Sequence, residues 1–396
     1  MKILLVSALK ENEVGGVISH MKSLGNGLEK IGHDVEYVTL SSIPRILQIT
    51  GLYLPKIIIG KFSLQMRDAW HFLFIKYSIE RILLCKQFIK KYDAIIAQDV
   101  FVCMSSKMTK SIFRIPILFT VHSYISDVLA GDHIKKESFV EKWFISVDEK
   151  SYNLADKIIT VDTRIKDHIC NEYNISSDKI SVAINFLDTE DFKKIEIDSD
   201  LFEKYNMPIG KKIILCPRRL VPKNGVIYAA KSLKLIRDKI GEKFVMVFTG
   251  NKGPIAAEIK RIIGKDKLQG NAIFIESVKH DQMKYLYNLS DLVIIPSINY
   301  KGLEEATSIS ALEAMACCVP VIASNIGGLK EIIEDGENGY LIPEKDPEKI
   351  ANKVCEILFT DQSYLISNAR KYVENNCSNV QRARDYIQLI ETIRKN

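Results

Sequence analysis

The chain has 396 residues, of which 26% are charged and 47% hydrophobic, and its formal net charge is +6. This composition excludes a disordered chain, and the length predicts two domains. The eight cysteines include no Cys-x-x-Cys pair, so they predict buried thiols in a reducing compartment and no zinc site. Outside residues 43–92 the chain is close to neutral, which argues against a nucleic-acid partner.

The first residues, MKILLVS, are too short for the apolar core of a signal peptide and predict a buried strand. No uncharged apolar run reaches the roughly 18 residues that a membrane span needs. We therefore expect a cytoplasmic protein. Peripheral contact with the inner face of a membrane depends on the interpretation of residues 43–92.

Apolar runs alternate with helical stretches through the first half of the chain. The predicted strands are KILLVS, DVEYVTL, DAIIAQ, IPILFTVH, DKIITVD and KISVAI. The predicted helices are 17–31, a long region ending near Lys91, 100–112, 136–153 and 163–173. Strands joined by helical crossovers indicate a parallel sheet that is covered on both faces.

Residues 43–92 contain nine basic and two acidic side chains, mixed with apolar residues such as Trp70 and Phe74. Cations beside Trp, Phe and Leu are typical of an interfacial helix that enters the headgroup region of an anionic leaflet. The alternative is a helical pair whose apolar face packs on the first domain while its cations are solvated. The sequence leaves both interpretations open.

A polar stretch from Asn185 to about Lys211 precedes a second series of strands and helices. The predicted strands are KKIILCP, KFVMVFTG, NAIFIES, DLVIIPS, VPVIAS and GYLIP, and the predicted helices are 223–240, 254–264, 281–289, 306–317 and 329–334. The fold class is therefore α/β, with two doubly wound halves. Ligands of such sheets bind beyond the carboxyl ends of the strands.

The segment EATSISALEAMACCVPVIAS, which begins at Glu305, is the most informative part of the sequence. It places Glu305 and Glu313 eight positions apart around the start of an apolar helix, and a strand and a glycine pair follow. A carboxylate can accept hydrogen bonds from both cis hydroxyls of a ribose. Helix amides near Ser308 and Ile309 could hold the adjoining phosphates. Two solvated glutamates on a surface helix would have the same spacing.

With the DGENG loop that follows, this order resembles the E-x7-E element of the retaining family-4 glycosyltransferases, glycosyltransferase group 1. The resemblance covers nearly the whole chain and is strongest from 212 to 345. It implies the GT-B fold, in which two Rossmann-like domains face a central cleft. Residues 1–190 would form the acceptor-side domain and 191–378 the nucleotide-sugar domain, with helix 379–396 packing back on the first domain.

The segment CPRRLVPKNG closes the first strand of the second half. The family pattern Arg-Leu-x-x-x-Lys-Gly matches Arg219 and Gly225, but its lysine position holds Asn224, and Lys223 lies one residue earlier. The resemblance implies that Arg219, with Lys223 or Asn224, binds the leaving diphosphate, for which a guanidinium offers a planar fork. Arg218 is either a further site residue or part of a salt bridge.

The resemblance also implies that Glu313 binds ribose and Glu305 the hydroxyls of the sugar. His122, at the carboxyl end of IPILFTV, would contact the donor sugar or orient the acceptor hydroxyl, although a lone strand-end histidine is more often structural. Asp127 is predicted on the acceptor side.

The resemblance implies that three further segments lie near the donor. Gly15 and Gly16 precede a helix whose amides could reach a phosphate or the sugar, although an ordinary helix-entry turn would look the same. Gly250 in FTGNKGP is predicted to bring backbone close to the nucleotide. The ESVKH segment, which contains Val278, is predicted to flank the base.

The predicted function is retaining transfer of a hexose-type sugar from a nucleotide diphosphate sugar to a sugar or lipid-linked acceptor, in polysaccharide or glycolipid assembly. The residues predicted to be catalytic are His122, Arg219, Lys223 and Glu305. No cofactor or metal is expected, because cations and helix amides meet the diphosphate and the D-x-D at Asp198 lies in the polar stretch. The alternatives are a sugar-nucleotide epimerase, which needs no acceptor, and a non-catalytic binding module.

Overall fold

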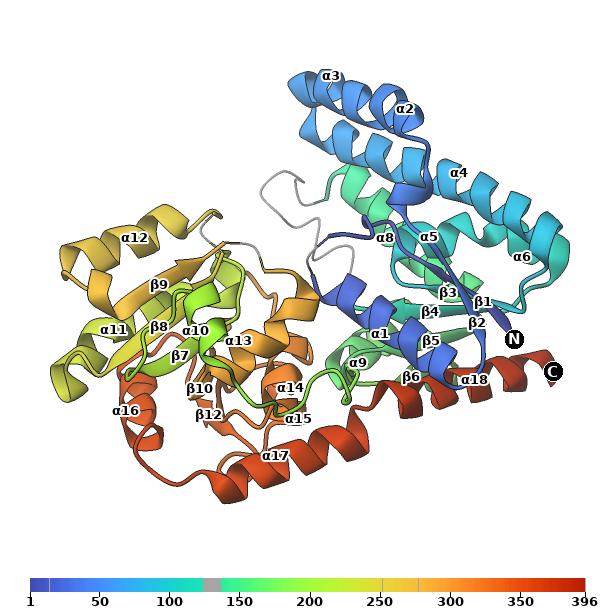
Figure 1. Cartoon of the computed structure of the whole chain (residues 1–396). Coiled ribbons are helices and arrows are strands. Elements are labelled where there is room, and N and C mark those ends of the chain that lie inside the picture. The colour runs from blue at the N-terminus through green and yellow to red at the C-terminus, as the bar shows by residue number, and fades with distance from the viewer. Residues whose placement is uncertain (14, 124–136, 251, 277, 396) are drawn as a thin grey trace. The chain divides into compact units, whose positions relative to one another are not determined.

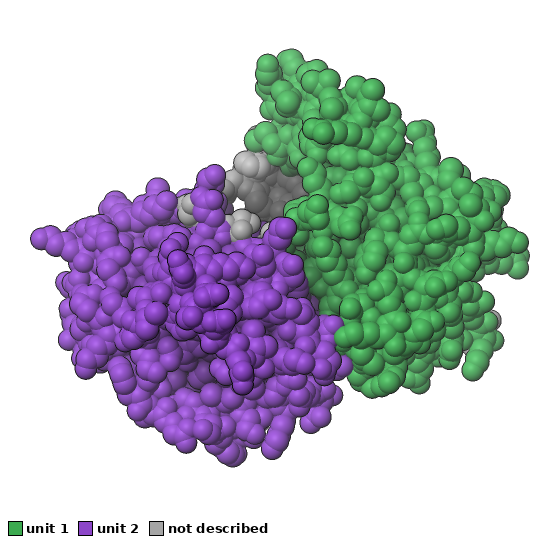
Figure 2. All heavy atoms as spheres, in the orientation of Figure 1, with its two compact units in different colours: residues 1–184, 379–396 green, residues 185–378 purple. Residues whose placement is uncertain are grey.

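The computed structural model describes residues 1–13, 15–123, 137–250, 252–276 and 278–395. By its contacts the chain divides into two compact units, which Figure 2 colours separately. Unit 1 comprises Met1–Ile184 and Asn379–Asn396, and unit 2 comprises Asn185–Ser378. Each unit is built on a parallel six-stranded sheet with helices around it, which confirms the predicted α/β class.

The sheet of unit 1 has the strand order β2-β1-β3-β4-β5-β6, and every neighbouring pair is parallel. Its strands are β1 (Lys2–Val6), β2 (Asp34–Val38), β3 (Ala94–Ala97), β4 (Ile117–Val121), β5 (Lys157–Thr160) and β6 (Ile180–Val182). Each strand lies within the apolar run predicted for it. All residues of β3 and β4 are buried, as expected for parallel strands covered on both faces.

The helices of unit 1 are α1 (Gly16–Lys30), α2 (Arg45–Leu47), α3 (Leu54–Phe62), α4 (Leu64–Lys90), α5 (Val100–Ser105), α6 (Lys107–Phe113), α8 (Phe139–Leu154), α9 (Thr163–Tyr173) and α18 (Asn379–Lys395). The long helical region predicted up to Lys91 is interrupted at Ser63. The Ser63 hydroxyl accepts a hydrogen bond from the Met66 amide and starts α4 there.

The last helix, α18, packs along α1 within unit 1 (Figure 1). A Cβ at Gly27 of α1 would lie 2.4 Å from the carbonyl oxygen of Asn379, so only glycine allows this approach. At the middle of the helix, the Tyr386 hydroxyl is 3.0 Å from the Thr120 hydroxyl on β4. These contacts join the end of the chain to the first sheet.

The sheet of unit 2 has the order β12-β11-β10-β7-β8-β9, again with parallel neighbours. Its strands are β7 (Lys212–Cys216), β8 (Phe244–Thr249), β9 (Ala272–Ile275), β10 (Leu292–Ile295), β11 (Val321–Ser324) and β12 (Tyr340–Ile342). The strand order reverses between β7 and β10. In doubly wound sheets ligands bind at this reversal, beyond the carboxyl ends of the strands.

The helices of unit 2 are α10 (Ser199–Lys204), α11 (Val226–Ile240), α12 (Ala256–Lys265), α13 (Met283–Leu289), α14 (Ile309–Ala316), α15 (Leu329–Ile332), α16 (Pro347–Ile357) and α17 (Ser363–Asn376). A core cluster joins α11, α12 and α16 to one face of the sheet, and Leu233 of α11 and Met246 of β8 are fully buried in it. On the other face α14 contacts β10 and β11, and α13 contacts β7.

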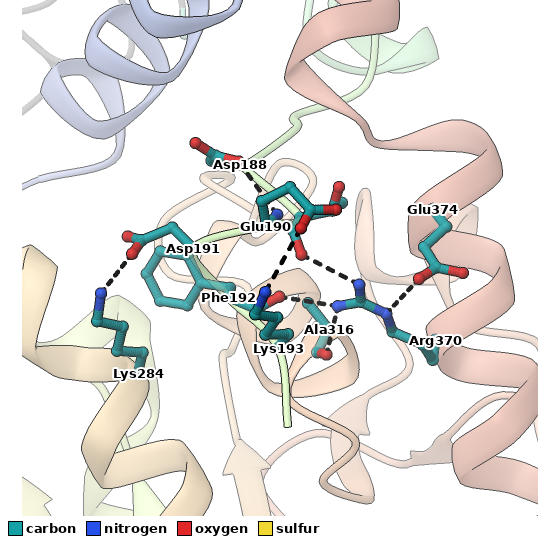
Figure 3. A network of polar contacts seen from close by, with 10 residues as sticks. Asp188, Glu190, Asp191, Phe192, Lys193, Lys284, Ala316, Arg370 and Glu374 are labelled. Carbon is teal, nitrogen blue, oxygen red and sulfur yellow. Dashed lines mark hydrogen bonds and ion pairs between the residues drawn. The ribbon is translucent and has the colours of Figure 1, made fainter. Parts of the chain in front are cut away.

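Arg370 of α17 fixes the segment at the start of unit 2, as Figure 3 shows. Its Nη1 donates hydrogen bonds to the carbonyl oxygens of Phe192 and Ala316, both at 2.8 Å, and its Nη2 donates to that of Thr189 at 3.0 Å. Its Nε lies 2.7 Å from Glu374. One guanidinium therefore joins three stretches of backbone: two in this segment and one at the end of α14.

Candidate functional site

Arg218 lies just beyond the carboxyl end of β7 and is the centre of a polar cluster at the strand reversal. Its Nη2 donates to Glu305 Oε2 at 2.6 Å and to Ser297 Oγ at 3.1 Å. The same nitrogen donates to Asn224 Oδ1 at 3.0 Å, and Nη1 donates to Ser308 Oγ at 3.4 Å. The side chains of Arg218 and Glu305 are only 10% and 12% exposed. Arg218 thus forms a salt bridge inside unit 2.

The turn before α11 is shaped to support this arginine. Asn224 is buried, and its Nδ2 donates to the carbonyl oxygen of Arg219 at 2.9 Å, so both polar atoms of its amide are used within the protein. The next residue, Gly225, has a φ of 63°, and a Cβ there would lie 1.7 Å from the carbonyl oxygen of Pro296. Only glycine fits this close approach to the exit of β10.

Arg219 and Lys223 are also cations near the carboxyl end of β7, but their side chains are not held as that of Arg218 is. Arg219 is exposed and Lys223 is half-buried. Neither side chain has a hydrogen-bond or ion-pair partner among the residues that the structure describes. Burial lowers the pKa of Lys223, and the charge of Glu305 opposes that effect in part. Lys223 is therefore the available cation of the turn, whereas Asn224 holds Arg218.

The pKa of Glu305 reflects two opposing effects. Burial raises it, but the charges of Arg218, Lys223 and Arg219 oppose burial, and the net pKa lies below the ordinary value. The arrangement therefore provides an ionised carboxylate with a fixed orientation.

The backbone that carries Glu305 is held from two sides within unit 2. Gly328 donates its amide to the carbonyl oxygen of Glu305 at 2.9 Å, and a Cβ on Gly328 would lie 2.5 Å from the Thr307 nitrogen. From the other side, Asn185 donates its Nδ2 to the Thr307 carbonyl at 2.5 Å and its amide to the Thr307 hydroxyl at 3.0 Å. Gly328, the second glycine of the pair noted in the sequence, thus positions the segment before α14.

The N-terminus of α14 has Ser308 as its N-cap and Ile309 as its first helical residue, three positions after the predicted start. The Ser308 hydroxyl accepts no hydrogen bond from the helix backbone and faces Arg218 instead. First-turn amides of a helix have no partner within the helix, and they favour an anion.

Glu313 lies in α14 with its side chain only 3% exposed. His280 Nε2 is 2.6 Å from its Oε1, and the Tyr287 hydroxyl donates to its Oε2 at 2.7 Å. Burial, reinforced by Glu313, raises the pKa of Tyr287 well above the usual value, so the phenol keeps the proton that it donates. The Phe192 ring packs 5.3 Å from the His280 ring. The ribose contact predicted for Glu313 remains a prediction.

Gly250 and Val278 lie at the same edge of the second sheet. Gly250 follows β8 directly and donates its amide to the carbonyl oxygen of Ile275, the last residue of β9, at 2.6 Å. Val278 is half-buried in the loop after β9. Both positions are compatible with a nucleotide bound beyond β7 and β10.

In unit 1, His122 lies just after β4 beside Gln98, which follows β3. His122 Nε2 donates to Gln98 Oε1 at 3.0 Å, which leaves Nδ1 as an acceptor. The buried Nε2 of Gln98 has no hydrogen-bond partner among the described residues. The His20 ring of α1 meets the His122 ring edge-on at 4.6 Å. Burial, followed by the charge of His20, lowers the pKa of His122 well below its ordinary value.

For Gly15, Gly16 and Asp127, the structure gives no contact that bears on their predicted roles. Gly15 precedes α1 with a φ of 170°, which any residue adopts, and a Cβ there would meet nothing within 4 Å. Gly16 is the exposed first residue of that helix. Asp127 lies outside the described residues.

Asp198 of the D-x-D sequence is the N-cap of α10, where it accepts hydrogen bonds from the Asp200 amide and the Ser199 hydroxyl. Across the described part of the chain, no group of three or more His, Cys, Asp or Glu residues could hold a metal ion. No helix among the described residues is long and apolar enough to span a bilayer.

The two parallel Rossmann-like units match a known protein class. A structure of HepE from Anabaena in complex with UDP-glucose superposes with a TM-score of 0.71 and 17% identity, covering 99% of this chain and 100% of HepE. The chain therefore has the GT-B fold, as predicted.

The family is shown by sequence. "Glycosyltransferase Family 4" matches residues 14–191, and "Glycosyl transferases group 1" matches residues 198–376. Together the two models match the two halves of the chain, which belongs to the family-4, group 1 glycosyltransferases and is a transferase enzyme. An uncharacterized glycosyltransferase of Methanocaldococcus jannaschii is 28% identical over 373 residues, covering 91% of this chain and 90% of that protein. The lipopolysaccharide 1,2-N-acetylglucosaminetransferase of Salmonella typhimurium is 29% identical over 208 residues, covering 50% and 53%.

Proposed function

We propose that the chain is a retaining glycosyltransferase that moves a hexose-type sugar from a nucleotide diphosphate sugar to an acceptor hydroxyl, in polysaccharide or glycolipid assembly. The family supports glycosyl transfer, and the Salmonella relative is named a lipopolysaccharide 1,2-N-acetylglucosaminetransferase. The UDP-glucose complex of HepE supports a nucleotide sugar as donor. The acceptor would be a sugar or a lipid-linked molecule.

The observation that carries this proposal is the arrangement of charges beyond β7. The side chains of Arg219 and Lys223 form no hydrogen bond or ion pair with the described residues, and they lie near an ionised Glu305 that Arg218 holds in place. A departing nucleoside diphosphate gains negative charge as its bond to the sugar breaks. The two cations and the first-turn amides of α14 would stabilise that charge without a metal ion.

The carboxylates would select the donor. An ionised Glu305 accepts hydrogen bonds from sugar hydroxyls, and its orientation is fixed by the bond from Arg218. Each carboxylate oxygen of Glu313 already accepts one hydrogen bond, from His280 or from Tyr287. The second lone pair of each oxygen would accept a hydrogen bond from a ribose hydroxyl. Gly250 and Val278 would lie beside the nucleotide.

On the acceptor side, His122 would offer Nδ1 as a hydrogen-bond acceptor, since its Nε2 donates to Gln98. The lowered pKa of His122 makes it a weak base, so it would orient the acceptor hydroxyl. The bond from the sugar to the diphosphate would break while the acceptor oxygen attacks from the same face. The leaving phosphate oxygen would take the acceptor proton, which requires no covalent intermediate.

A two-part experiment tests this function. Thermal unfolding with UDP, GDP, ADP and their sugars should show one nucleotide that raises the midpoint, because a ligand selective for the folded state stabilises it. The matching nucleotide sugar is then incubated with and without acceptor sugars. Conversion of the donor to an isomeric nucleotide sugar without acceptor would establish the epimerase alternative. Absence of any nucleotide effect would favour the binding-module alternative.

A further inference from the structure

Residues 45–62 form a helical hairpin with α4 in unit 1 (Figure 1). The chain runs through α2, a π-helical turn (Gln48–Tyr53) and α3, and then reverses at Ser63 into α4. The pairing is antiparallel, since Gly51 faces Phe74 and Gly60 faces Arg67. Trp70 of α4 donates its Nε1 hydrogen to the Gly51 carbonyl at 2.8 Å. The hairpin is therefore an ordered part of the fold.

Helix α3 has no buried residue. Its apolar side chains Leu54, Ile57, Ile58 and Phe62 are 49%, 60%, 58% and 86% exposed. Spacings of three and four residues place them on one side of the helix. A helix of a globular domain normally turns such a stripe toward the core, but here the stripe faces solvent. Ile46 and Leu47 of α2 are also exposed, at 70% and 51%.

The packing of α4 differs along its length. Its first buried residue is Phe72, and the buried positions then continue with Ile75, Ile79 and Leu83 along one side. Packing against the rest of unit 1 therefore explains the apolar residues in the later part of α4. It does not account for the apolar stripe of α3, because α3 contacts α4 and the preceding turn through its other side.

The charges around the stripe indicate its partner. Arg45 and Lys61 are exposed beside it, and the acidic Asp68 is already bonded to Arg67. A second copy of the chain would bring the same cations together, whereas an anionic surface would pair with them. Apolar side chains flanked by cations are how an amphipathic helix enters the interface of an anionic bilayer.

We propose that the surface formed by Ile46, Leu47, Leu54, Ile57, Ile58 and Phe62, called the hairpin surface, binds an anionic lipid bilayer with α3 lying in the headgroup region. Arg45 and Lys61 contact the lipid phosphates. This inference goes beyond glycosyl transfer, because the binding requires no donor or acceptor.

Flotation of the full chain with vesicles tests the proposal without an activity assay. Vesicles of phosphatidylglycerol and phosphatidylcholine should carry the protein upward at low salt and lose it as salt rises. Vesicles of phosphatidylcholine alone should bind it much less. Equal binding to both compositions, or no binding to either at low salt, would overturn the proposal.

A matched pair of variants locates the surface. Ile58→Ser with Phe62→Ser should reduce vesicle binding by about tenfold or more, because two exposed apolar side chains no longer insert. Ile209→Ser with Phe359→Ser removes an isoleucine and a phenylalanine that are 80% and 56% exposed in unit 2, and it should leave binding unchanged. Equal effects of the two pairs would contradict the assignment. So would a concentration-dependent dimer, detected by light scattering, that only the first pair abolishes.

Discussion

Arg218 and Arg219 are adjacent in the sequence but have different environments. Arg218 turns into the protein and bonds to four side chains, whereas Arg219 remains exposed. The buried arginine thus positions Glu305 and compensates its charge, and the exposed one is available to meet a ligand. Asn224 suits this arrangement, because a lysine at that position would place a second cation against the guanidinium.

Removal of Arg218 should change the titration of Glu305. In Arg218→Ala, burial still raises the pKa of Glu305 while the main opposing charge is gone, so the pKa rises. If transfer requires ionised Glu305, the acid limb of the pH dependence of kcat/KM moves to higher pH. Breaking a buried pair costs about 3–5 kcal/mol of stability, so Arg218→Lys provides a milder variant. The control is Arg237→Ala, which removes an arginine of α11 that bonds to the Lys267 carbonyl. Arg218→Lys keeps the charge and should move the acid limb less. An acid limb that stays at its wild-type pH in Arg218→Ala, or that moves as far in Arg218→Lys, would contradict this role.

At the scale of elements, α17 and the α3–α4 hairpin show how single side chains hold segments together. Arg370 of α17 bonds to three carbonyl oxygens, and Lys56 of α3 donates to His71 Nδ1 of α4 at 3.2 Å. Each interaction predicts a measurable effect on stability.

Arg370→Lys should destabilise the protein, because lysine keeps the charge but cannot present the planar fork that reaches three carbonyls. The expected cost is about 2–4 kcal/mol, since hydrogen bonds from a charged donor are each worth about 1.5–3 kcal/mol and do not add fully. Glu374→Gln removes only a half-exposed partner of the same arginine and should cost about 0.5 kcal/mol or less. Thermal unfolding measures both. Similar costs for the two variants would show that the carbonyl contacts do not matter.

His71 should make the stability of unit 1 sensitive to acid. Burial, with the charge of Lys56, lowers its pKa to about 4. Between the ordinary value and this one, the unfolded chain binds a proton that the folded chain does not, so stability falls as pH decreases from about 6.5 toward 4. At pH 5 the loss approaches about 2 kcal/mol. His71→Gln should lose less stability than the wild type between pH 7.5 and pH 5, to about that extent. The same loss in both proteins would contradict the assignment.

For the whole molecule, the strands were more predictable from the sequence than the site. All twelve strands found in the described residues lie within their predicted runs, because buried parallel strands are short continuous apolar segments. The outward stripe of α3 was not predictable, since its spacing is the same whether the helix faces core or solvent. Nothing in the sequence indicates that Tyr287 and His280 contact Glu313, because only the fold brings these distant residues together.

The proposed donor site meets the diphosphate with cations and helix amides, so a metal ion should not be needed. Exhaustive chelation should leave the affinity for the nucleotide within about twofold of its original value. A large loss of affinity that manganese restores would show that a metal takes part.

Above all, Arg219 should bind the diphosphate of the donor beyond β7. Calorimetric titration with UDP, GDP and ADP measures this most directly, comparing wild type with Arg219→Ala and with Arg261→Ala, which removes an exposed arginine of α12. One nucleotide should bind, and Arg219→Ala should weaken it on the order of 10–100-fold, as expected for a lost charge-assisted hydrogen bond. Arg261→Ala should bind like the wild type. Unchanged affinity in Arg219→Ala would contradict the proposed donor site.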